Sequence, residues 1–469
     1  MNNLLLSTKI GSNLPYTPTL DQEKMLESLI SFLFSKEENS IFLLKGYAGT
    51  GKSSLIGAVV QTIIQLSQNV VLLAPTGRAA RIFSQYSGAP AQTIHRKIYR
   101  QSKAYGESYE SQLNINPHKN TIFFVDEASM ISTRGNESRG ASILEELIEY
   151  VYSAENCRLI LIGDTAQLPP VGESDSPALV SSYIGGFGLE VSEYTLTQVV
   201  RQAEESGILW NATLLRKYMQ QEDLSTLPKL DLKGFKDIKA IGGEDLPDNL
   251  NSSYNRSGSE ETIIITRSNK RAKLFNNGIR AQVLYMEEEL STGDLLLISK
   301  NNYFVATEYR DIDFIANGEI AQVTRVRRRE ELYGFHFAEV SIHLFDRDIE
   351  IDIKIITESL HSESATLTNE QQNTLFNNVA EEYLHIGNQN AIMRKIKQDP
   401  FFNALQVKYA YCLTCHKAQG GQWKEVYIDL ANINPQHIGL DFYRWLYTAI
   451  TRSTERVYLV NMPEEMILM

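Results

Sequence analysis

The chain contains Gly46-Tyr47-Ala48-Gly49-Thr50-Gly51-Lys52-Ser53, which matches the phosphate-loop pattern G-x-x-x-x-G-K-[ST] without a substitution. The short apolar run before it, residues 41–44, is typical of a buried strand. Residues 55–66 follow with apolar side chains near helical spacing. The loop is therefore predicted to join a strand to a helix. There its glycines allow a tight turn, and its N–H groups and the helix dipole favour phosphate.

This loop is expected to hold a nucleotide. Lys52 would reach the outer phosphates, and Ser53 would hold Mg²⁺. An ordinary glycine turn with an unrelated lysine is the alternative interpretation. The residues expected to contact the nucleotide here are Gly46, Ala48, Gly49, Thr50, Gly51, Lys52, Ser53 and Ser54.

A second apolar run, residues 121–125, ends in two carboxylates, Asp126 and Glu127. Because burying a charge costs free energy, carboxylates at the end of a buried strand need a reason. Beside a phosphate loop, Asp126 would hold Mg²⁺ and Glu127 would activate the attacking water as general base. Two acidic residues that simply begin a loop are the alternative.

Two further strands end in polar loops. Residues 69–74 are followed by Pro75 and Thr76, which would stop the strand and cap a helix, and His95 lies in a later segment rich in phosphate donors. Residues 158–162 lead to Gln167, whose amide would sense a γ-phosphate. Three such strands predict an α/β domain with a nucleotide-binding parallel sheet.

Composition bounds the other possibilities. The 469 residues suggest two to four domains, and the net charge of −12 does not itself advertise nucleic-acid binding. Only three cysteines occur, Cys157, Cys412 and Cys415, which argues against a disulfide framework and favours a reducing cytosol. No apolar run approaches the ~20 residues that span a bilayer, so no membrane partner is expected.

Six sequence blocks then form a familiar series. They are the phosphate loop and residues 125–127, 163–170, 198–202, 414–420 and 447–452. Their order resembles that of superfamily 1 DNA helicases, above all the RecD-like and Dda-like branch. Two features depart from it: Cys415 with the Gly420-Gly421-Gln422-Trp423 ending, and a long polar loop over residues 132–142.

The resemblance implies a fold and an activity. It implies two RecA-like parallel-sheet motor domains that share one ATP and its Mg²⁺, with an SH3-like β-barrel inserted in the second and a pin-like hairpin in the first. The implied activity is ATP-driven 5′ to 3′ movement on single-stranded DNA and at duplex junctions, with a monomer as the motor unit.

Residue roles also follow from the resemblance. Gln22 would read adenine, although a helix-capping role explains it from sequence alone. Lys52, Asp126, Glu127 and Gln167 keep the roles given above, and Arg201 and Arg452 would approach the phosphates from the second domain. The residues expected to face the DNA strand are Pro75, Thr76, His95, Thr266, Asn269, Thr414 and His416. For Thr266 and Asn269, an ordinary solvated helix start is the alternative.

The expected domain division follows composition and resemblance together. The first motor domain covers residues 1–195, with the pin at about 98–119. The second covers 196–289 and 404–469, with a single strand expected over residues 405–413, and closely spaced short strands place the inserted barrel at 290–403. A cationic run, Arg325 and residues 327–329, would suit DNA phosphates or be a plain strand end.

Three other functions fit parts of this pattern. A non-motor P-loop switch that controls a protein partner would need the first sheet alone. A DNA-binding regulator with a vestigial ATP site would not need the intact Lys52, Asp126, Glu127 and Arg452. An RNA-directed motor would use the same residues, so it stays open.

Overall fold

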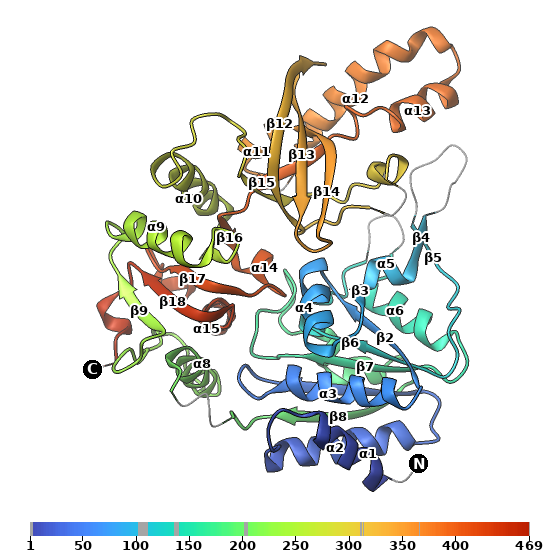
Figure 1. Ribbon diagram of the computed structural model, residues 1–469, viewed down its shortest axis with the longest axis vertical. Coiled ribbons are helices and arrows are strands. Elements are labelled where there is room, and N and C mark those ends of the chain that lie inside the picture. The colour runs from blue at the N-terminus through green and yellow to red at the C-terminus, as the bar shows by residue number, and fades with distance from the viewer. Residues whose placement is uncertain are drawn as a thin grey trace.

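The computed structural model describes residues 3–101, 111–135, 140–200, 205–309, 312, 314–364 and 366–468. It contains two parallel sheets, each flanked by helices, and a closed barrel beside the second sheet (Figure 1). The expected fold class, two RecA-like units with a small β-barrel inserted in the second, is confirmed.

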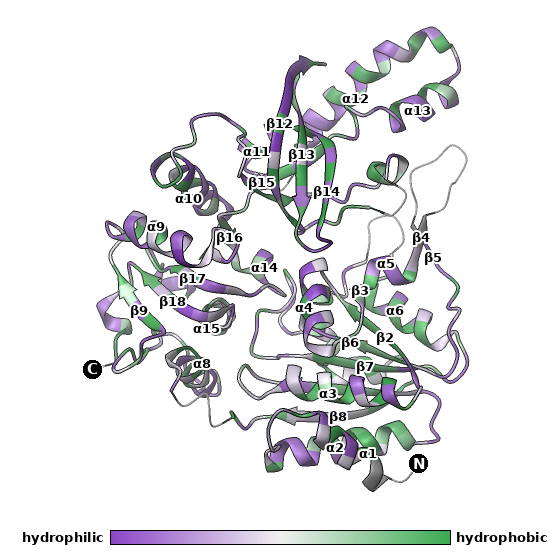
Figure 2. Ribbon diagram, in the orientation of Figure 1, coloured by the Kyte–Doolittle hydropathy of each residue, from purple (hydrophilic) through white to green (hydrophobic). Residues whose placement is uncertain are grey.

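The first sheet has six parallel strands in the order β3-β2-β6-β7-β1-β8. Its central strands are apolar and buried on both faces, as parallel sheets between helices require. Figure 2 shows this hydrophobic concentration in the strands. The strands are β1 (Ser40–Gly46), β2 (Asn69–Ala74), β3 (Ala91–Thr93), β6 (Thr121–Val125), β7 (Arg158–Gly163) and β8 (Glu190–Leu196).

Helices cover both faces of this sheet and bury two separate apolar clusters against it. Thr19 and Gln22 form a reciprocal capping box that starts α2. The helices are α1 (Asn3–Asn13), α2 (Leu20–Phe34), α3 (Lys52–Gln65), α4 (Gly77–Ser87), α5 (Ile94–Ile98), α6 (Ile143–Tyr152) and α7 (Ser181–Gly185).

A two-stranded antiparallel ribbon follows α5 where the pin is expected. It pairs β4 (Tyr99–Gln101) with β5 (Ser111–Leu113). The remainder of the expected pin, residues 102–110, lies outside the described residues.

The second sheet has five parallel strands in the order β16-β10-β17-β18-β9. These strands are β9 (Ile238–Ile241), β10 (Thr262–Thr266), β16 (Cys412–Thr414), β17 (Trp423–Asp429) and β18 (Ser453–Val460). The helices of this unit are α8 (Gly207–Tyr218), α9 (Leu246–Ser257), α10 (Asn269–Gln282), α14 (Cys415–Ala418) and α15 (Leu440–Ile450).

The inserted barrel closes through five strands, β11 (Leu295–Ile298), β12 (Ile320–Leu332), β13 (Phe335–Leu344), β14 (Ile349–Ile356) and β15 (Leu405–Tyr409). The single strand expected over residues 405–413 is in fact two, because β15 pairs with β11 and β14 while β16 joins the second sheet. Between β14 and β15 the chain forms α11 (Glu358–His361), α12 (Asn369–Tyr383) and α13 (Gln389–Lys397). The last two project from the barrel and carry mostly hydrophilic residues (Figures 1 and 2).

The cationic run on β12 is largely neutralised within the protein. Arg327 pairs with Asp352 at 2.7 Å, Arg328 approaches Glu330 at 3.5 Å, and Arg329 pairs with Glu288. These arginines therefore brace the barrel surface, which favours the strand-end interpretation over free phosphate contacts. Within the described ranges, no helix is both long enough and apolar enough to cross a membrane.

A buried carboxylate ties α9 to the second sheet. Glu425 on β17 accepts from Arg256 Nε at 2.7 Å, Ser257 Oγ at 2.6 Å and Tyr458 Oη at 3.0 Å, and also from Ser253. Burial alone would raise the pKa of Glu425, but these hydrogen bonds together lower it to about 2.

Replacing Glu425 with Gln is expected to destabilise the protein by about 3 kcal/mol at pH 7, since its pKa falls from 4.5 to about 2 on folding. The wild type holds this stability above the unfolded pKa and loses it as pH falls toward the folded pKa, so the difference should narrow below pH 4.5. Urea denaturation between pH 7 and pH 4 measures this. Glu455→Gln, at an exposed position on β18, is the control, and a pH-independent difference would contradict the assignment.

Candidate nucleotide and nucleic-acid site

The phosphate loop follows β1 and bends into α3. Gly49 and Gly51 have φ angles of +77° and +78°, which only glycine adopts without strain, and α3 begins at Lys52. The Lys52 ammonium folds back on the loop and donates to the carbonyl oxygens of Gly46 and Tyr47. The loop is therefore already in a phosphate-binding shape, with its cation held at the mouth of α3.

A cleft of about 330 Å³ lies over this loop and brings most of the expected catalytic residues together. It is lined from the first unit by Lys52, Ser53, Asp126, Glu127 and Gln167, and from the second by Arg452. Five residues from three segments that lie far apart in sequence thus meet an arginine near the end of the chain. Ala48, Gly49, Gly51 and Ser54 also line the cleft.

The acidic pair at the end of β6 is placed by its own hydrogen bonds. Asp126 accepts from Tyr86 Oη at 2.6 Å and from the Glu127 backbone N–H at 2.8 Å. Glu127 has a left-handed backbone with φ of +51°, an arrangement that is rare outside glycine and often marks functional positions. This turn directs both carboxylates into the cleft.

Burial raises the pKa of both carboxyl groups, even though Lys52 and Arg452 act against the rise. For Glu127, the neighbouring carboxylates of Asp126 and Asp164 raise the pKa further. A raised pKa brings a carboxylate closer to the range useful for a general base at neutral pH. The electrostatics of Glu127 therefore suit the role expected of it.

Arg452 connects the second unit to this acid. Its Nη1 lies 3.7 Å from Glu127 Oε1 and donates to the Gly421 carbonyl at 3.3 Å, while its Nε donates to the Thr448 carbonyl at 3.2 Å. The side chain is only 4% exposed, so its position is set by packing and by these carbonyls. A guanidinium held in this way can stabilise phosphate charge without further rearrangement.

The oxygen atoms of the cleft fit a hard divalent cation. The Ser53 hydroxyl and the Asp126 carboxylate line the same space, and Mg²⁺ prefers one or two protein oxygens completed by phosphates and water. Among the residues that the structure describes, no three His, Cys, Asp or Glu side chains gather as a complete metal cage. Among the residues that the structure describes, none bonds to the buried Gln167 Oε1, so this acceptor is free for a donor such as a water molecule in the cleft.

Gln22 is buried beside the loop but does not line the cleft. Its Nε2 donates to the Thr50 carbonyl at 2.9 Å, and its Oε1 accepts from the Thr19 N–H at 3.0 Å. Both ends of the amide are thus used to cap α2 and brace the loop, so reading adenine would require this amide to exchange partners.

Arg201 lies outside the described residues. The segment just before it runs close to the phosphate loop, because the Val200 N–H donates to the Gly49 carbonyl at 3.0 Å. A role for Arg201 at the phosphates stays a prediction.

The expected DNA-facing residues separate into two groups. Thr76 caps α4, and Gly420 of the second unit lies directly against it, so Pro75 and Thr76 border the junction between the units. Asn269 and Thr414 line one small pocket of the second unit, and His416 is exposed nearby on α14. His95 lies on α5, where burial lowers its pKa.

Thr266 is a correction to this group. Its side chain is fully buried, and its hydroxyl donates to Asp429 Oδ2 at 3.3 Å. Because the hydroxyl faces the interior of the second sheet, it is not available to a DNA backbone in this structure.

Three side chains of the second unit make four hydrogen bonds across the cleft that were not expected from sequence. The Tyr447 hydroxyl accepts from the Ala48 N–H of the phosphate loop at 2.9 Å and donates to Asp164 Oδ2 at 2.6 Å. The Thr448 hydroxyl accepts from the Leu168 N–H, and Gln419 Nε2 donates to the Leu168 carbonyl. These side chains lie within recognised blocks, but no sequence signal identifies their partners in the other unit.

A further contact joins the units beside Thr76. The Arg78 guanidinium stacks on the Trp423 ring at 3.8 Å from its centroid and donates to the Gln422 carbonyl. The Gly420–Trp423 segment that departs from the usual pattern is therefore used to hold α4.

Comparisons with known proteins agree with this arrangement. Residues 21–231 match an AAA domain family, and residues 409–460 match the UvrD-like helicase C-terminal domain. The chain is 31% identical to the ATP-dependent RecD2 DNA helicase of Deinococcus radiodurans, over 41% of this chain and 24% of that protein. It is 24% identical to the ATP-dependent DNA helicase dda of Enterobacteria phage T4, over 56% and 57% respectively. The matches thus span about a quarter and just over half of these relatives.

A solved structure shares the fold. The Pif1 helicase from Bacteroides, in complex with ADP-AlF3 and single-stranded DNA, superposes with a TM-score of 0.50 at 14% identity. The superposition covers 97% of this chain and 95% of that one. At this identity the likeness concerns the fold alone.

Replacing Tyr447 with Phe is expected to destabilise the closed pair of units by about 1–3 kcal/mol, because the change leaves a buried carboxylate oxygen and a backbone N–H unpaired. Hydrogen exchange in residues 46–54 should become faster as the cleft loosens. Tyr152→Phe, which loses one bond to the Ser40 carbonyl within the first unit, is the matched control. Equal exchange in both variants would contradict this role.

Proposed function

The chain belongs to the superfamily 1 DNA helicases, and from this premise we propose that it moves 5′ to 3′ along single-stranded DNA and unwinds duplex, driven by ATP hydrolysis. The observation that carries the proposal is the shared cleft, where Arg452 of the second unit lies 3.7 Å from Glu127 of the first, over the Lys52 loop. The direction of movement rests on the family resemblance.

In this proposal each charged group has one task. Lys52 and Arg452 neutralise charge on the transferring phosphoryl group, with Arg201 as a second arginine, and Glu127 positions the attacking water. Ser53 and Asp126 would hold Mg²⁺, which would supply positive charge to the phosphates, and Gln167 would bond the γ-phosphate. The remaining nucleotide contacts proposed are Gln22 and the loop from Gly46 to Ser54.

Hydrolysis becomes movement because the catalytic set is divided between the units. Arginines supplied from another domain are worth roughly 10³–10⁵ in phosphoryl-transfer rate, so turnover is fast only while the units are together. Cycles of closure and opening would then move the DNA-facing residues Pro75, Thr76 and His95 relative to Asn269, Thr414 and His416.

The unit boundaries are part of the proposal. We assign residues 1–195 to the first motor domain, 196–289 with 404–469 to the second, and 290–403 to the insertion, with one change: β15 (Leu405–Tyr409) closes the barrel and therefore belongs to the insertion. We also propose a monomeric motor that works in a reducing cytosol, since all three cysteines are free and buried.

Single-stranded DNA should accelerate ATP turnover, and a duplex with a 5′ tail should be separated in preference to one with a 3′ tail. Lys52→Ala and Glu127→Gln should abolish the stimulated turnover with the fold retained, as judged by circular dichroism. DNA and RNA tails compared side by side identify the nucleic acid used. Turnover unaffected by any strand would favour a P-loop switch instead, and wild-type rates in either variant would remove the assigned roles.

Arg452→Ala should lose ATP hydrolysis far more than ATP binding, because its guanidinium is expected to act on charge that develops in the transition state. The expected loss is about 10³-fold in kcat, with a change of only a few-fold in the dissociation constant of ATP. Arg456→Ala is the control, since Arg456 approaches Glu425 rather than the cleft. Equal losses of binding and turnover would argue against this role.

A further inference from the structure

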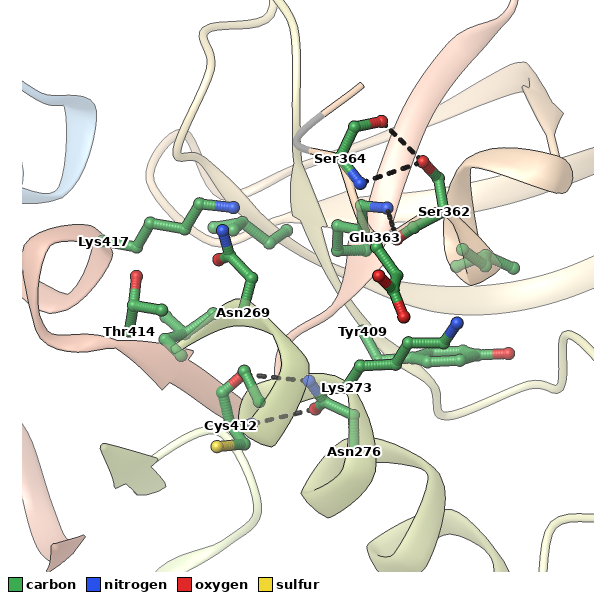
Figure 3. Close-up of a pocket in the computed structure, with 15 residues that line it drawn as sticks. Asn269, Lys273, Asn276, Ser362, Glu363, Ser364, Tyr409, Cys412, Thr414 and Lys417 are labelled. Atoms are coloured by element: carbon green, nitrogen blue, oxygen red, sulfur yellow. Dashed lines mark hydrogen bonds between the residues drawn. The ribbon is translucent and has the colours of Figure 1, made fainter. Parts of the chain in front are cut away.

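A small pocket of about 50 Å³ lies where α10, the barrel and the segment after β16 meet (Figure 3). Three lysines from three different elements line it: Lys273 on α10, Lys408 on β15 and Lys417 on α14. Such a concentration of one charge is unusual in an acidic protein, and it lies far along the chain from the Lys52 loop.

Two of the three ammonium groups are held by backbone carbonyl oxygens. Lys273 Nζ donates to the His361 carbonyl at 2.6 Å, and Lys408 Nζ donates to the Ser362 carbonyl at 2.6 Å. Across the described ranges, none of the three lysines has a carboxylate oxygen within ion-pair distance. Glu363 also lines the pocket.

Holding these like charges together costs free energy. Burial, together with the positive charges of Lys417 and Lys273, lowers the pKa of Lys408 to about 8. Burial also lowers the pKa of Lys417. An anion placed among the three would recover this cost, since charge-assisted hydrogen bonds are about twice as strong as neutral ones.

Neutral donors complete the lining. Asn269 begins α10, where the helix dipole favours an anion, and the Thr414 side chain stands at the start of α14 without forming a capping bond. The volume has room for roughly three to five water-sized groups, which suits the four oxygens of one phosphate.

We propose that this pocket seats one phosphate group of the bound nucleic-acid strand, held by Lys273, Lys408 and Lys417 together with Asn269 and Thr414. The proposal rests on the proposed function and extends it, because Lys408 belongs to the strand that closes the barrel. Residues of the insertion and of the second motor unit would thus bind the same phosphate at the junction between these two parts. Glu363 would hinder binding, so Glu363→Gln should tighten it.

Lys408→Met tests the seat, because methionine keeps most of the aliphatic stem while it removes the charge. Single-stranded DNA binding should weaken about ten-fold, and the slope of log K against log salt should fall by about 0.7, the value for one lost phosphate contact. Lys229→Met, at an exposed lysine of the second unit that does not line the pocket, is the charge-matched control. Lys229→Met should keep the wild-type DNA dependence of ATP turnover, whereas Lys408→Met should need more DNA to reach half-maximal stimulation.

A strand scanned with single methylphosphonate linkages identifies the occupant. At one position, a neutral linkage should weaken DNA binding by the wild type. The same linkage should weaken binding by Lys408→Met almost no further than the substitution already does. Free phosphate is the other possible occupant, and competition by inorganic phosphate, compared with chloride at equal ionic strength, tests it. If phosphate competes more strongly than chloride in the wild type alone, and no linkage of the strand is sensitive to neutralisation, the pocket is a free-phosphate site and the proposal is overturned.

A salt slope that does not change in Lys408→Met would also overturn the proposed phosphate site. In that case, ATP turnover by the wild type that is stimulated by DNA would still support the motor function. If the wild type neither binds single-stranded DNA nor responds to it, the proposed function fails and the seat fails with it.

Discussion

Charged side chains from distant parts of the sequence line one cleft, and neighbouring groups compensate each of these charges. Lys52 rests on loop carbonyls, Asp126 accepts from Tyr86, and Glu127 lies near Arg452. A buried charge without a partner is costly. If the two sheets separate, Arg452 and Glu127 must therefore become exposed to water or find new partners. A polyphosphate between them would replace these contacts with stronger ones, and so the state of the cleft and the distance between the sheets are linked.

The barrel is built into the second unit and not merely attached to it. The buried Arg280 of α10 pairs with Asp294 at 2.7 Å where the barrel begins, and Asn276 exchanges two hydrogen bonds with the Cys412 backbone at 2.9 Å each. Only Ala410 and Tyr411 separate the closing barrel strand from the second sheet. Motion of the second unit must therefore carry the barrel with it, because the two share one apolar core and the buried Arg280–Asp294 ion pair.

The fold was predictable where chemistry limits the choice of residue. A phosphate loop demands glycine at positive φ, and carboxylates at the end of an apolar strand require a partner, so Gly51 and Asp126 identified the first sheet directly. Positions that depend on a distant neighbour were not predictable: Thr266 faces Asp429, and Tyr447 bonds to two groups some 280 and 400 residues earlier in the chain. The division of residues 405–413 into two strands escaped prediction because local patterning does not say which sheet a short apolar run joins.

One short segment touches both the cleft and the lysine pocket, and this gives communication between them a physical route. Thr414 and Lys417 line the pocket, while Gln419 donates to Leu168 beside the cleft and the Gly421 carbonyl accepts from Arg452. The single helical turn of α14 and three further residues span the whole distance, which is too short to absorb a shift at either end. When closure over a nucleotide moves Arg452, the same segment must move Thr414 and Lys417, so the grip on a strand and the state of the cleft change together through covalent geometry and packing.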